Sequence, residues 1–537
     1  MELKIRLPFE AVYILKKLNQ AGYDSYLVGG AVRDILLNAL NDNEHKQEIT
    51  DFDFTTNAKP AEIQEIFSES YYTNEFGMVG IGYDHLLEEI QAKFSIKTQD
   101  NIKSIFNQQN TKTKKLINQT TVNKVHSSLK KELNHLQTKD RKILTPPPFE
   151  ITTYRSDGEY CNHRKPESVC WGETVEDDLS RRDFTINAMA LCLNQATLDL
   201  LWVDGEIQHN KYLLDSSQYK LVDLHQGLQD LTNQLIRTVG DADQRFREDA
   251  LRMLRAIRFS TQLNMEIEPL ALNSIKKQAH LIKAISWERI RDEFLRMLSS
   301  NQPDLAIKIL DQTGLLEHIM PELLPTKNVE QGGHHTTDVW THTLDAVANC
   351  PNPDPIVRLA SLLHDIGKPG TYAIRNGEIT FYNHEIVGSR IANKIGKRLK
   401  LSRKQSQKLF ELVRYHMFYY QPDQTDAAVR RIIKRIGLKN IDDMLAVREA
   451  DRLGSGSRKT SWRLEELKQR IIEQLNQPFT VTDLVIDGQD LMKALELKPG
   501  PIIGNILDQL MEKVLDNPEA NTKEKLLKIA KEIVEEN

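Results

Sequence analysis

Cysteine is scarce in this chain of 537 residues, with four in all, at positions 161, 170, 192 and 350. No two of them form a CxxC pair, so we expect neither a disulfide framework nor a cysteine-ligated zinc site, and a reducing cytoplasm fits. Long apolar runs are missing as well, and we therefore expect no membrane-spanning helix. The N-terminal sequence MELKIRLPFEAVYILKKLNQ lacks the apolar segment of a signal peptide, so we expect no secretory signal.

An excess of positive charge is also absent. The chain has 71 Lys and Arg against 76 Asp and Glu, which gives a net charge of -5. This balance excludes a globally basic nucleic-acid-binding protein but allows a local basic groove. With 40% hydrophobic and 27% charged residues, the composition is that of a soluble protein with several domains.

The pattern of the sequence changes along the chain. Short apolar runs separated by Gly- and Asp-containing turns over 24–84 indicate an α/β segment. Residues 97–142 contain no Gly or Pro, but eleven Asn and Gln, and eleven Lys and Arg against three acids. We interpret 97–142 as an insertion between two strands, either a solvated, partly helical or disordered excursion or a basic arm that contacts RNA. From about residue 240 onward, amphipathic segments predict helices.

Two carboxylates stand two residues apart in the segment TDFDFTT. Alternate residues of a strand share a face, so we expect Asp51 and Asp53 side by side, with Phe52 and Phe54 in the core. Adjacent like charges are unfavourable without a cation between them, and two oxygen ligands suit Mg²⁺. The pattern is common in surface strands, so its meaning depends on its context.

That context is the segment LVGGAVRD at 27–34, an apolar strand followed by two glycines. Glycines that open a helix let backbone N–H groups approach a triphosphate, which predicts phosphate binding at Gly30. Arg33, one turn into the helix, can make a bidentate contact with phosphate. The glycines, the arginine and the two carboxylates together predict a nucleotide site with a metal.

The order GGAVRD, then DFDFTT, resembles the nucleotidyltransferase head of the class II tRNA nucleotidyltransferase and poly(A) polymerase family. DDLSRRDFTINAMA at 177–190 is similar to the family's RRDFT-x-N-A motif, and REDALRMLRAIRF at 247–259 is similar to its EDxxR motif. The resemblance implies an α+β fold, in which a small mixed-sheet head precedes an all-helical remainder.

The same resemblance predicts a division of the chain into four parts. Residues 1–206 form the head, with the Lys-, Asn- and Gln-rich insertion at about 85–145, and 207–332 form a helical neck with the EDxxR helix. Residues 333–476 form a second helical domain, and 477–537 form a C-terminal tRNA-binding region. The insertion departs from the family's pattern.

For the head, the resemblance implies that Asp51 and Asp53 are catalytic and hold Mg²⁺. One metal ion would activate the RNA 3′-hydroxyl and the other would brace the triphosphate and the leaving pyrophosphate. Glu150, in the pattern Phe-Glu-Ile, is either a third carboxylate on the neighbouring strand or an acid on an edge strand. Arg182 is expected to contact phosphate, whereas Asp183 orients the motif or a metal-bound water.

Asp249, Arg252, Arg255 and Arg258 recur every three residues, a spacing that predicts a row winding around one side of a helix. Three successive arginines without intervening acids require an anionic partner, so we assign all four residues to nucleotide binding. In the family, the Asp and Arg of EDxxR bond the edge of the incoming base, and Asp249 and Arg252 match those positions. A carboxylate there accepts from the exocyclic amino group that C and A both carry.

A second set of residues follows the order H…HD…D and resembles the HD phosphohydrolase superfamily, an all-helical metal-binding fold. It comprises His342, His364, Asp365 and Asp451. Imidazole combined with carboxylate suits a divalent transition metal better than Mg²⁺ alone. His384 and His416 lie where the superfamily often has further histidines, for a second metal or a substrate phosphate. The implied substrates are phosphomonoesters or 2′,3′-cyclic phosphates; the alternative is a degenerate fold that only packs helices against RNA.

Two further segments carry the resemblance. Residues 153–169 resemble the flexible loop of family members that add the terminal A, which argues against an enzyme that adds only C. Residues 483–507 resemble the C-terminal RNA-binding region, and Lys-Pro-Gly-Pro at 498–501 predicts a rigid turn before a helix.

The sequence therefore predicts an enzyme that adds or repairs the 3′-terminal CCA of tRNA without a template, from CTP and ATP, releasing pyrophosphate. Three alternatives stay open: an A-adding enzyme that needs a partner for the two Cs, a poly(A) polymerase, and an HD phosphohydrolase with an RNA-binding head. The expected partners are tRNA and the two nucleotides, with no membrane; the sequence leaves the oligomeric state open.

Overall fold

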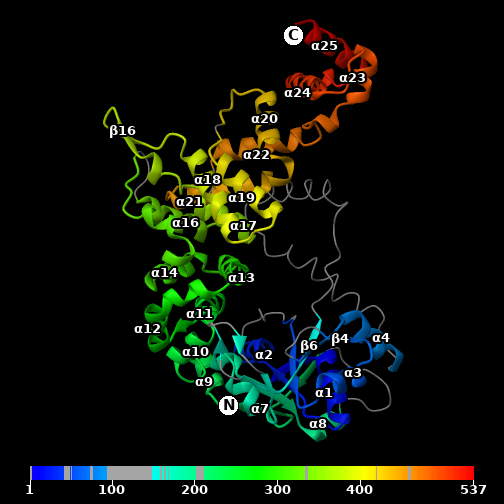
Figure 1. The fold of residues 1–537 in the computed structure, drawn as a ribbon, viewed down its shortest axis with the longest axis vertical. Helices are drawn as coiled ribbons and strands as arrows, with labels where there is room; N and C mark the ends of the chain where they lie inside the picture. Colours follow the sequence, from blue (N-terminus) through cyan, green and yellow to red (C-terminus); the bar gives the residue numbers. More distant parts are fainter. Residues whose placement is uncertain are drawn as a thin grey trace. The chain divides into compact units, whose positions relative to one another are not determined.

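A computed structural model provides the fold, which consists of two compact units, one ending at Ile319 and the other beginning at Met320 (Figure 1). The structure describes residues 3–41, 49, 51–72, 77–93, 148–157, 160–161, 165–166, 169–200, 211–332, 337–418, 420–457 and 461–536. Each unit is treated separately below.

The first unit contains a seven-stranded mixed sheet, as the resemblance implies. Only β3 and β6 run parallel among the neighbouring strands of this sheet; the other pairs are antiparallel. The strands, in spatial order, are β13 (Tyr219–Asp223), β11 (Met189–Leu193), β2 (Tyr26–Val28), β3 (Asp53–Thr56), β6 (Phe149–Thr153), β5 (Met78–Ile81) and β4 (Ser70–Tyr72).

Residues 51–54 follow the predicted alternation of side chains, although strand β3 begins only at Asp53 and its last three residues are all buried. Phe52 and Phe54 are buried, Asp51 is exposed and Asp53 is half-buried. The helices that accompany this sheet along the chain are α1 (Phe9–Gln20), α2 (Gly30–Leu40), α3 (Pro60–Ile66), α4 (Tyr83–Lys93), α7 (Val175–Ser180), α8 (Gln195–Leu200) and α9 (Gly227–Thr232). Their apolar faces complete the core, as Val12 and Leu36 illustrate, each with no exposed surface.

Smaller strand pairs accompany the main sheet. β1 (Ile5–Pro8) pairs with β12 (Lys211–Leu214). In the segment predicted to be a flexible loop, β7 (Arg155–Asp157) pairs with β10 (Val169–Trp171), and β8 (Tyr160–Cys161) pairs with β9 (Lys165–Pro166). The predicted insertion at 97–142 lies outside the described residues, and its position in the chain falls between β5 and β6, which are antiparallel neighbours.

Helices form the rest of the first unit, together with one short parallel strand pair, β14 (Leu235–Ile236) and β15 (Glu266–Ile267). The helices are α10 (Ala242–Glu248), α11 (Leu251–Leu263), α12 (Pro269–Gln278), α13 (Trp287–Leu298), α14 (Pro303–Gln312) and α15 (Leu315–Ile319). The apolar residues of α11, including Leu254 and Ile257, have no exposed surface. Helix α11 therefore packs within a helical core, where it contacts α13 and α14.

The second unit is almost entirely helical, as predicted. Its helices are α16 (Val339–Ala348), α17 (Pro355–Leu363), α18 (His384–Arg398), α19 (Arg403–Tyr415), α20 (Asp426–Ile436), α21 (Ile441–Gly454), α22 (Trp462–Gln474), α23 (Gly488–Leu495), α24 (Pro501–Asp516) and α25 (Lys523–Glu536). Within the part of this unit that the structure describes, the exception is a hairpin of β16 (Ala373–Arg375) and β17 (Glu378–Thr380). Its turn is Asn376-Gly377, both at positive φ, the sequence signal of a tight hairpin.

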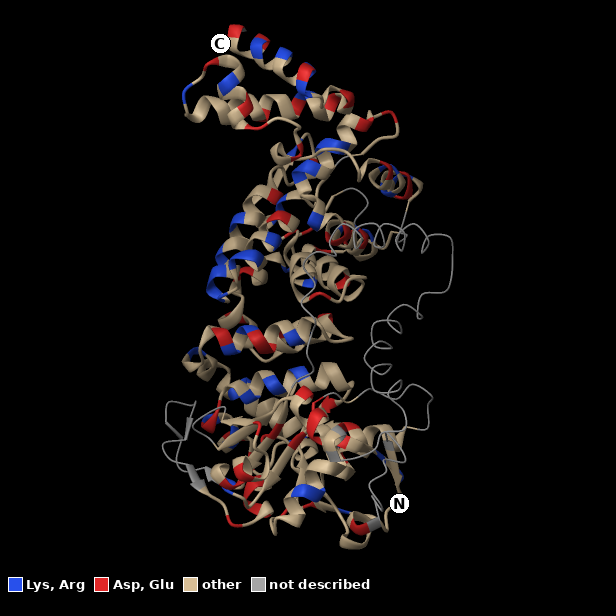
Figure 2. Cartoon of the chain, turned by 90° about the vertical axis from the view of Figure 1, so that its right-hand side faces the viewer, with Lys and Arg blue, Asp and Glu red and all other residues tan. Residues whose placement is uncertain are grey.

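The C-terminal helices carry charges of both signs, interspersed along each helix (Figure 2). Helix α24 begins at Pro501 directly after Gly500, which confirms the turn predicted there. Among the described residues, no helix is both long enough and apolar enough to cross a membrane.

Candidate nucleotidyl-transfer site and a histidine–aspartate cluster

Strand β2 leads into a glycine turn at the N-terminus of α2. Gly29 has a φ of 72°, a conformation that favours glycine, and a Cβ there would lie 3.0 Å from Nη1 of Arg182 and 3.4 Å from Oδ2 of Asp53. Gly30, predicted from the sequence, is the first residue of α2. The N–H groups of a first helical turn have no helical partner, so this turn offers donors to an anion beside Asp53.

The carboxylates lie on the central strands next to this turn. Strand pairing places Asp53 opposite Val28 of β2 on one side and opposite Glu150 of β6 on the other. Burial first, and the charge of Asp51 second, raise the pKa of Asp53 to about 6, although Arg182 acts in the opposite direction. Burial and Asp51 also raise the pKa of Glu150. Negative charge is therefore concentrated at this point without a full counter-charge.

This donor set fits a hard divalent cation. Carboxylate oxygens are the ligands that Mg²⁺ takes in proteins, and a cation would relieve the repulsion that raises these pKa values. Strand β6 lies between β3 and β5, so Glu150 is not on an edge strand, and that alternative is wrong. Its role as a third ligand stays a prediction.

Asp178 fixes the two arginines of the RRDFT motif. Its side chain is fully buried and accepts from Nε and Nη2 of Arg182, at 3.2 and 2.9 Å, and from Arg181. Burial opposes ionisation of Asp178, but the charge of Arg182 and then that of Arg181 outweigh it, so its pKa is lowered. The Nη1 end of Arg182 is thereby directed at the glycine turn, as its predicted phosphate contact requires.

A chain of hydrogen bonds connects α2 to α11. Arg33 makes two bonds to its neighbour Asp34, at 2.7 and 3.0 Å, and its Nη1 donates to Oδ1 of Asn187 at 2.9 Å. Asn187 donates to Asp183 at 3.4 Å, and Arg255 donates to Asp183 at 2.5 Å. Asp183 therefore orients its own motif, one of the two roles predicted for it, and Arg33 has protein partners in addition to any phosphate.

The EDxxR segment does not form one continuous helix, so the prediction that Asp249 and the three arginines share a helical row is wrong. Helix α10 ends at Glu248, Asp249 is extended with φ -139° and ψ 105°, and α11 begins at Leu251. The physical reason is local: Oδ1 of Asp249 accepts from the N–H of Leu251 at 3.0 Å, a side-chain bond that competes with the helical pattern.

Asp249 is held from a second helix. Arg289 of α13 donates to both of its carboxylate oxygens, at 3.4 and 2.6 Å. Arg252 is buried, and its Nη1 donates to the carbonyl of Arg245 at 3.1 Å and to Glu248 at 2.5 Å. The two residues predicted to read the base are thus fixed at the break between α10 and α11.

The anionic partners required by the other two arginines lie within the protein. Nε of Arg258 is 3.2 Å from Oε2 of Glu293 on α13, and Arg255 is paired with Asp183. Burial lowers the pKa of Arg258 to about 10, even though Glu293 acts against this. These contacts connect α11 to α13 and to the head motif; nucleotide binding by Arg255 and Arg258 stays a prediction.

In the second unit, the structure brings together all four residues of the predicted metal site. Oδ1 of Asp451, on α21, lies 3.3 and 3.7 Å from Nε2 of His342 on α16 and Nε2 of His364 after α17. Oδ2 of Asp365 lies 3.3 and 3.2 Å from the same two nitrogens. The two imidazole nitrogens are 3.0 Å apart.

His384 and His416 extend this arrangement into a second group. Nε2 of His384, the first residue of α18, lies 3.3 Å from Nε2 of His416 and 3.3 Å from Oδ1 of Asp365. Oδ1 of Asp365 is 3.9 Å from His416, so the two oxygens of this carboxylate face two different histidine pairs. His342, His364 and Asp451 form one group that could hold a metal ion, and Asp365, His384 and His416 form another. These six residues are called the histidine–aspartate cluster below.

The cluster selects the histidine tautomer that binds metals. Nδ1 of His364, His384 and His416 lies 2.7, 2.9 and 2.8 Å from the carbonyl oxygen of the residue three positions earlier. A carbonyl only accepts, so each Nδ1 carries the hydrogen, which leaves the lone pair of each neutral Nε2 facing the cluster.

The pKa values of the cluster residues also indicate a site that can hold a cation. Burial disfavours the imidazolium of His364, but Asp365 and Asp451 outweigh it and raise its pKa to about 10. Burial likewise opposes ionisation of Asp365 and Asp451. The charges of His364 and Lys368 nevertheless hold the pKa of Asp365 well below the usual range, and hydrogen bonds from His342 and His364 do the same for Asp451. Burial and His364 lower the pKa of His416 to about 3. The carboxylates of the cluster thus favour positive charge, which a proton on His364 supplies in the metal-free protein and which a metal ion would supply in its place.

Several residues that position these sites were not found from the sequence. Arg289 and Glu293 lie in a segment whose pattern predicts only an amphipathic helix, and Asn187 lies in the RRDFT-x-N-A motif, from which the sequence assigns it no role. In the second unit, Lys368 donates to Oδ2 of Asp365 at 2.6 Å and Arg448 donates to Asp451 at 2.7 Å. Lys368 is the lysine of the Gly-Lys-Pro segment at 367–369, shortly after His364-Asp365. This segment is the sequence signal from which its place beside the cluster could have been predicted.

A glycine turn at a helix N-terminus, beside acidic residues on the central strands of a mixed sheet, defines the class of nucleotidyltransferases. Residues 25–99 and 84–237 match the family "Poly A polymerase head domain". Residues 264–326 match "Probable RNA and SrmB- binding site of polymerase A", and residues 386–530 match "tRNA nucleotidyltransferase domain 2 putative".

Curated relatives and solved structures agree with these matches. The chain is 33% identical over 352 residues to the A-adding tRNA nucleotidyltransferase of Deinococcus radiodurans, covering 63% of this chain and 75% of the relative. It is 26% identical over 528 residues to the CCA-adding enzyme of Ligilactobacillus salivarius, covering 98% and 97%. The fold matches that of the Bacillus stearothermophilus CCA-adding enzyme in complex with CTP, with TM-score 0.61, 23% identity, and 98% and 97% of the chains covered. The chain belongs to the tRNA nucleotidyltransferase and poly(A) polymerase family.

Proposed function

We propose that this protein adds or repairs the 3′-terminal CCA of tRNA, using CTP and ATP and releasing pyrophosphate. The observation that carries the proposal is the match over nearly the whole length of both chains to a CCA-adding enzyme. The glycine turn beside Asp53 and the fixed pair Asp249 and Arg252 support it. A four-part division of the chain belongs to this proposal, with the boundaries at 332 and 476 kept and the first boundary moved from 206 to beyond β13 (Tyr219–Asp223), because that strand pairs with β11 in the sheet of the head. Location in the cytoplasm belongs to the proposal as well.

Asp51 and Asp53 are the residues that would hold Mg²⁺, with Glu150 beside them. When bound, Mg²⁺ would neutralise the triphosphate and lower the pKa of the attacking 3′-hydroxyl. The sheet contributes position, because the pairing of β3 with β2 and β6 fixes Asp53 between the glycine turn and Glu150. Such positioning supplies much of the rate in nucleotidyl transfer, which requires little covalent chemistry from the protein.

The glycine turn and Arg182 would bind the triphosphate. The N–H groups at the start of α2 are donors for phosphate oxygens, and the helix dipole favours negative charge there. Arg182, held by Asp178, would neutralise the charge that develops on the leaving pyrophosphate. Gly29 keeps this space open, because any side chain at that position would meet Arg182 and Asp53.

Asp249 and Arg252 would select the base. A carboxylate can accept a hydrogen bond from the exocyclic amino group of C or A, and a guanidinium can donate to a ring nitrogen or carbonyl. Arg289 orients Asp249 by two hydrogen bonds, so the direction in which this carboxylate accepts depends on α13.

The experiment that tests the function is nucleotide addition to three tRNA substrates, lacking CCA, lacking CA and lacking A, each with CTP or ATP alone. A CCA-adding enzyme uses CTP on the first two and ATP on the third. An A-adding enzyme, the alternative favoured by the 33% identical relative, extends only the third. Incorporation of long adenosine runs on any of them would instead identify a poly(A) polymerase.

A second activity is supported by the histidine–aspartate cluster. We infer a metal-dependent phosphohydrolase in which His342, His364, Asp365 and Asp451 hold a divalent transition metal, and in which His384 and His416 share Asp365 with a second one. The ligand atoms of His342, His364 and Asp451 all lie within 4.8 Å of one another, and those of Asp365, His384 and His416 do as well, which supports this inference because a metal ion needs donor atoms that converge on one point. When bound, the metal would activate a water for attack on phosphorus.

The hydrolase is tested with the pure protein supplied in turn with Ni²⁺, Mn²⁺, Co²⁺ and Mg²⁺, and with a phosphomonoester and a 2′,3′-cyclic phosphate. Hydrolysis of either supports the activity. Absence of hydrolysis with all four metals would favour the alternative, in which the cluster only stabilises the helical fold.

A further inference from the structure

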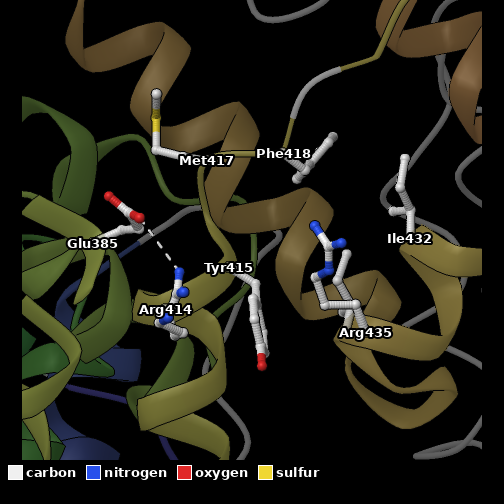
Figure 3. A pocket seen from close by; sticks show the side chains of 8 residues that line it. Glu385, Arg414, Tyr415, Met417, Phe418, Ile432 and Arg435 are labelled. Atoms are coloured by element: carbon white, nitrogen blue, oxygen red, sulfur yellow. Dashed lines mark hydrogen bonds and ion pairs between the residues drawn. The ribbon is translucent and has the colours of Figure 1, made fainter. Parts of the chain in front are cut away.

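Partly exposed aromatic side chains occur in both units of the protein. In the second unit, Tyr415 and Phe418 line a cavity of about 230 Å³, beside the pair of Arg414 and Glu385 (Figure 3). The residues that line this cavity include no member of the histidine–aspartate cluster or of the nucleotidyl-transfer site, so a ligand there would not contact the reacting groups of either. In the first unit, Tyr71 lies on the same sheet as the carboxylates of the nucleotidyl-transfer site.

A row of residues in register crosses the main sheet, with one residue on each of five neighbouring strands. In spatial order, they are Val28, Asp53, Glu150, Gly80 and Tyr71. Residues directly opposite one another on neighbouring strands point to the same face of a sheet. Tyr71, on the edge strand β4, therefore shares a face with Asp53 and Glu150.

Gly80 leaves a space on this face, and the ring of Tyr71 fills it. A Cβ at Gly80 would lie 2.7 Å from Cζ of Tyr71, 2.9 Å from Cε2 and 3.0 Å from the hydroxyl oxygen. The ring thus reaches from β4 across β5, toward the strand that carries Glu150, and a glycine is what allows this close approach. Tyr71 is nevertheless 47% exposed, so one side of its ring is open to a ligand.

The triphosphate is expected on the opposite side of the carboxylates. The glycine turn follows β2, and a side chain at Gly29 would meet both Arg182 and Asp53. In nucleotidyl transfer, the attacking and the leaving oxygen lie roughly in line across the phosphorus. With pyrophosphate leaving at the glycine turn, the attacking 3′-hydroxyl therefore approaches from the side of β6 and β5, where the ring of Tyr71 lies.

We propose that Tyr71 is the stacking surface for the base of the 3′-terminal nucleotide of the acceptor RNA. By holding this base, the ring positions the attacking hydroxyl beside Asp53 and Glu150. This inference rests on the nucleotidyl transfer proposed above and adds a substrate-binding residue to it.

Stacking suits the changing end of the acceptor. During CCA addition, the last base of the acceptor changes from that of the nucleotide before CCA to C. Hydrogen bonds specific to one base would fail when the base changes, whereas every base has a π-face that an aromatic ring can contact. A stacking surface therefore binds the acceptor at each step without reading its sequence.

The test uses the full-length protein, ATP, and tRNA lacking the terminal A, which the A-adding alternative extends as well. Tyr71→Leu keeps an apolar side chain over Gly80 but removes the aromatic face, and Tyr71→Phe keeps the ring without its hydroxyl. The matched control is Tyr72→Leu. Tyr72 is 48% exposed on the same strand but is paired with Val79, so it points to the other face. Melting curves verify that each variant is folded.

We expect Tyr71→Leu to lower kcat/KM for the tRNA by about 5- to 150-fold, because one base stack is lost. The KM for ATP should change little, since the triphosphate lies on the other side of the carboxylates. Tyr71→Phe and Tyr72→Leu should behave as the wild type. If Tyr71→Phe were as slow as Tyr71→Leu, the hydroxyl would be the contact and the stacking proposal would be overturned.

An acceptor whose last nucleotide has no base separates stacking from a purely structural role of the ring. On this acceptor, the wild type should be slower by the same factor that Tyr71→Leu loses on the normal tRNA. Tyr71→Leu should lose nothing further, because its stack is already gone. An equal loss from Tyr71→Leu on both acceptors would mean that the ring supports only the sheet.

Fluorescence separates the role of Tyr71 from the proposed function itself. With 2-aminopurine as the last base of the acceptor, fluorescence falls when that base stacks, and it is measured without ATP. Quenching by the wild type and by Tyr72→Leu, but not by Tyr71→Leu, supports the stacking surface even if the protein transfers no nucleotide. In that case only the proposed function fails. Equal fluorescence with all three proteins would show that the assignment of Tyr71 is wrong, whether or not the wild type adds nucleotides.

Discussion

The two polar centres of this chain differ in how they accommodate charge. In the head, carboxylates lie on adjacent strands, and the pKa of Asp53 is raised to about 6 by burial and by Asp51. In the second unit, imidazoles and carboxylates from α16, α18 and α21 and from the ends of α17 and α19 enclose one another, and the pKa values of Asp365 and Asp451 are held well below the usual range. The first centre holds surplus negative charge, whereas the second is internally compensated.

From this difference we infer that the two proposed metal sites would use their metals differently. A partly exposed set of oxygen ligands suits Mg²⁺ that arrives with a substrate triphosphate and leaves with pyrophosphate. A buried set of imidazole and carboxylate ligands suits a transition metal that stays bound between turnovers, because the tautomers are fixed by backbone carbonyls. The predictions below test this contrast, beginning with the largest expected effect.

The first prediction removes the charge of the head centre. Asp53→Asn should lower nucleotide addition by about three orders of magnitude or more, because the metal interaction contributes several kcal/mol to the transition state. Binding of tRNA, measured by gel shift, should change little. Removing the charge should not lower the melting temperature, because the ionised form of Asp53 is unfavourable in the fold. Near-normal rates would contradict the assignment of Asp53.

The second prediction separates the two centres. The double change His364→Ala, Asp365→Ala should remove metal-dependent phosphohydrolysis completely and leave CCA addition within about threefold, because the residues belong to different compact units. The amount of transition metal bound to the purified protein, measured by mass spectrometry, should fall in this double variant. The Asp53→Asn variant should keep its bound transition metal. Melting curves control for loosening of the helices, since buried ligands also support the fold. A parallel loss of CCA addition in a fully folded variant would show that the two centres are coupled.

The third prediction concerns the choice of base. Asp249→Asn or Arg252→Ala should lower the preference for CTP and ATP over UTP and GTP by about 5- to 150-fold, corresponding to about 1–3 kcal/mol. Arg289→Met should act in the same direction by less, because it frees Asp249 without removing it. The measurement is kcat/KM for each of the four nucleotides. If all four rates fell equally, these residues would position the helices and would not read the base.

The smallest effect expected is a pH dependence of Mg²⁺ binding at the head. The folded pKa of Asp53, about 6, exceeds its ordinary value of 3.8, so its contribution to stability is complete at low pH and is lost as pH rises through 6. Mg²⁺ should restore this lost stability because it binds the ionised form of Asp53. It should therefore raise the melting temperature by about 2–4 °C at pH 8 and by less at pH 5. Asp53→Asn should abolish the difference. An equal rise at both pH values would place the metal elsewhere.

The sequence by itself determined the local chemistry of this protein. The two-residue spacing of Asp51 and Asp53 and the Gly-Gly turn each fix geometry within a few residues, because strand alternation and glycine's access to positive φ are local properties. The order of the motifs led to the family and to the mixed sheet, and the order H…HD…D identified residues that the fold brings within hydrogen-bond distance.

Only the tertiary structure decided which charges meet. The break at Asp249 depends on a bond to Leu251 and on Arg289 forty residues away, so a three-residue spacing alone predicted a continuous helix. Glu293 meets Arg258 only because α13 packs on α11. The position of Glu150 beside Asp53 depends on the parallel pairing of β3 and β6, which are nearly a hundred residues apart in the chain. Periodicity reports which side chains share a face, whereas the partner of a buried charge is chosen by packing between distant segments.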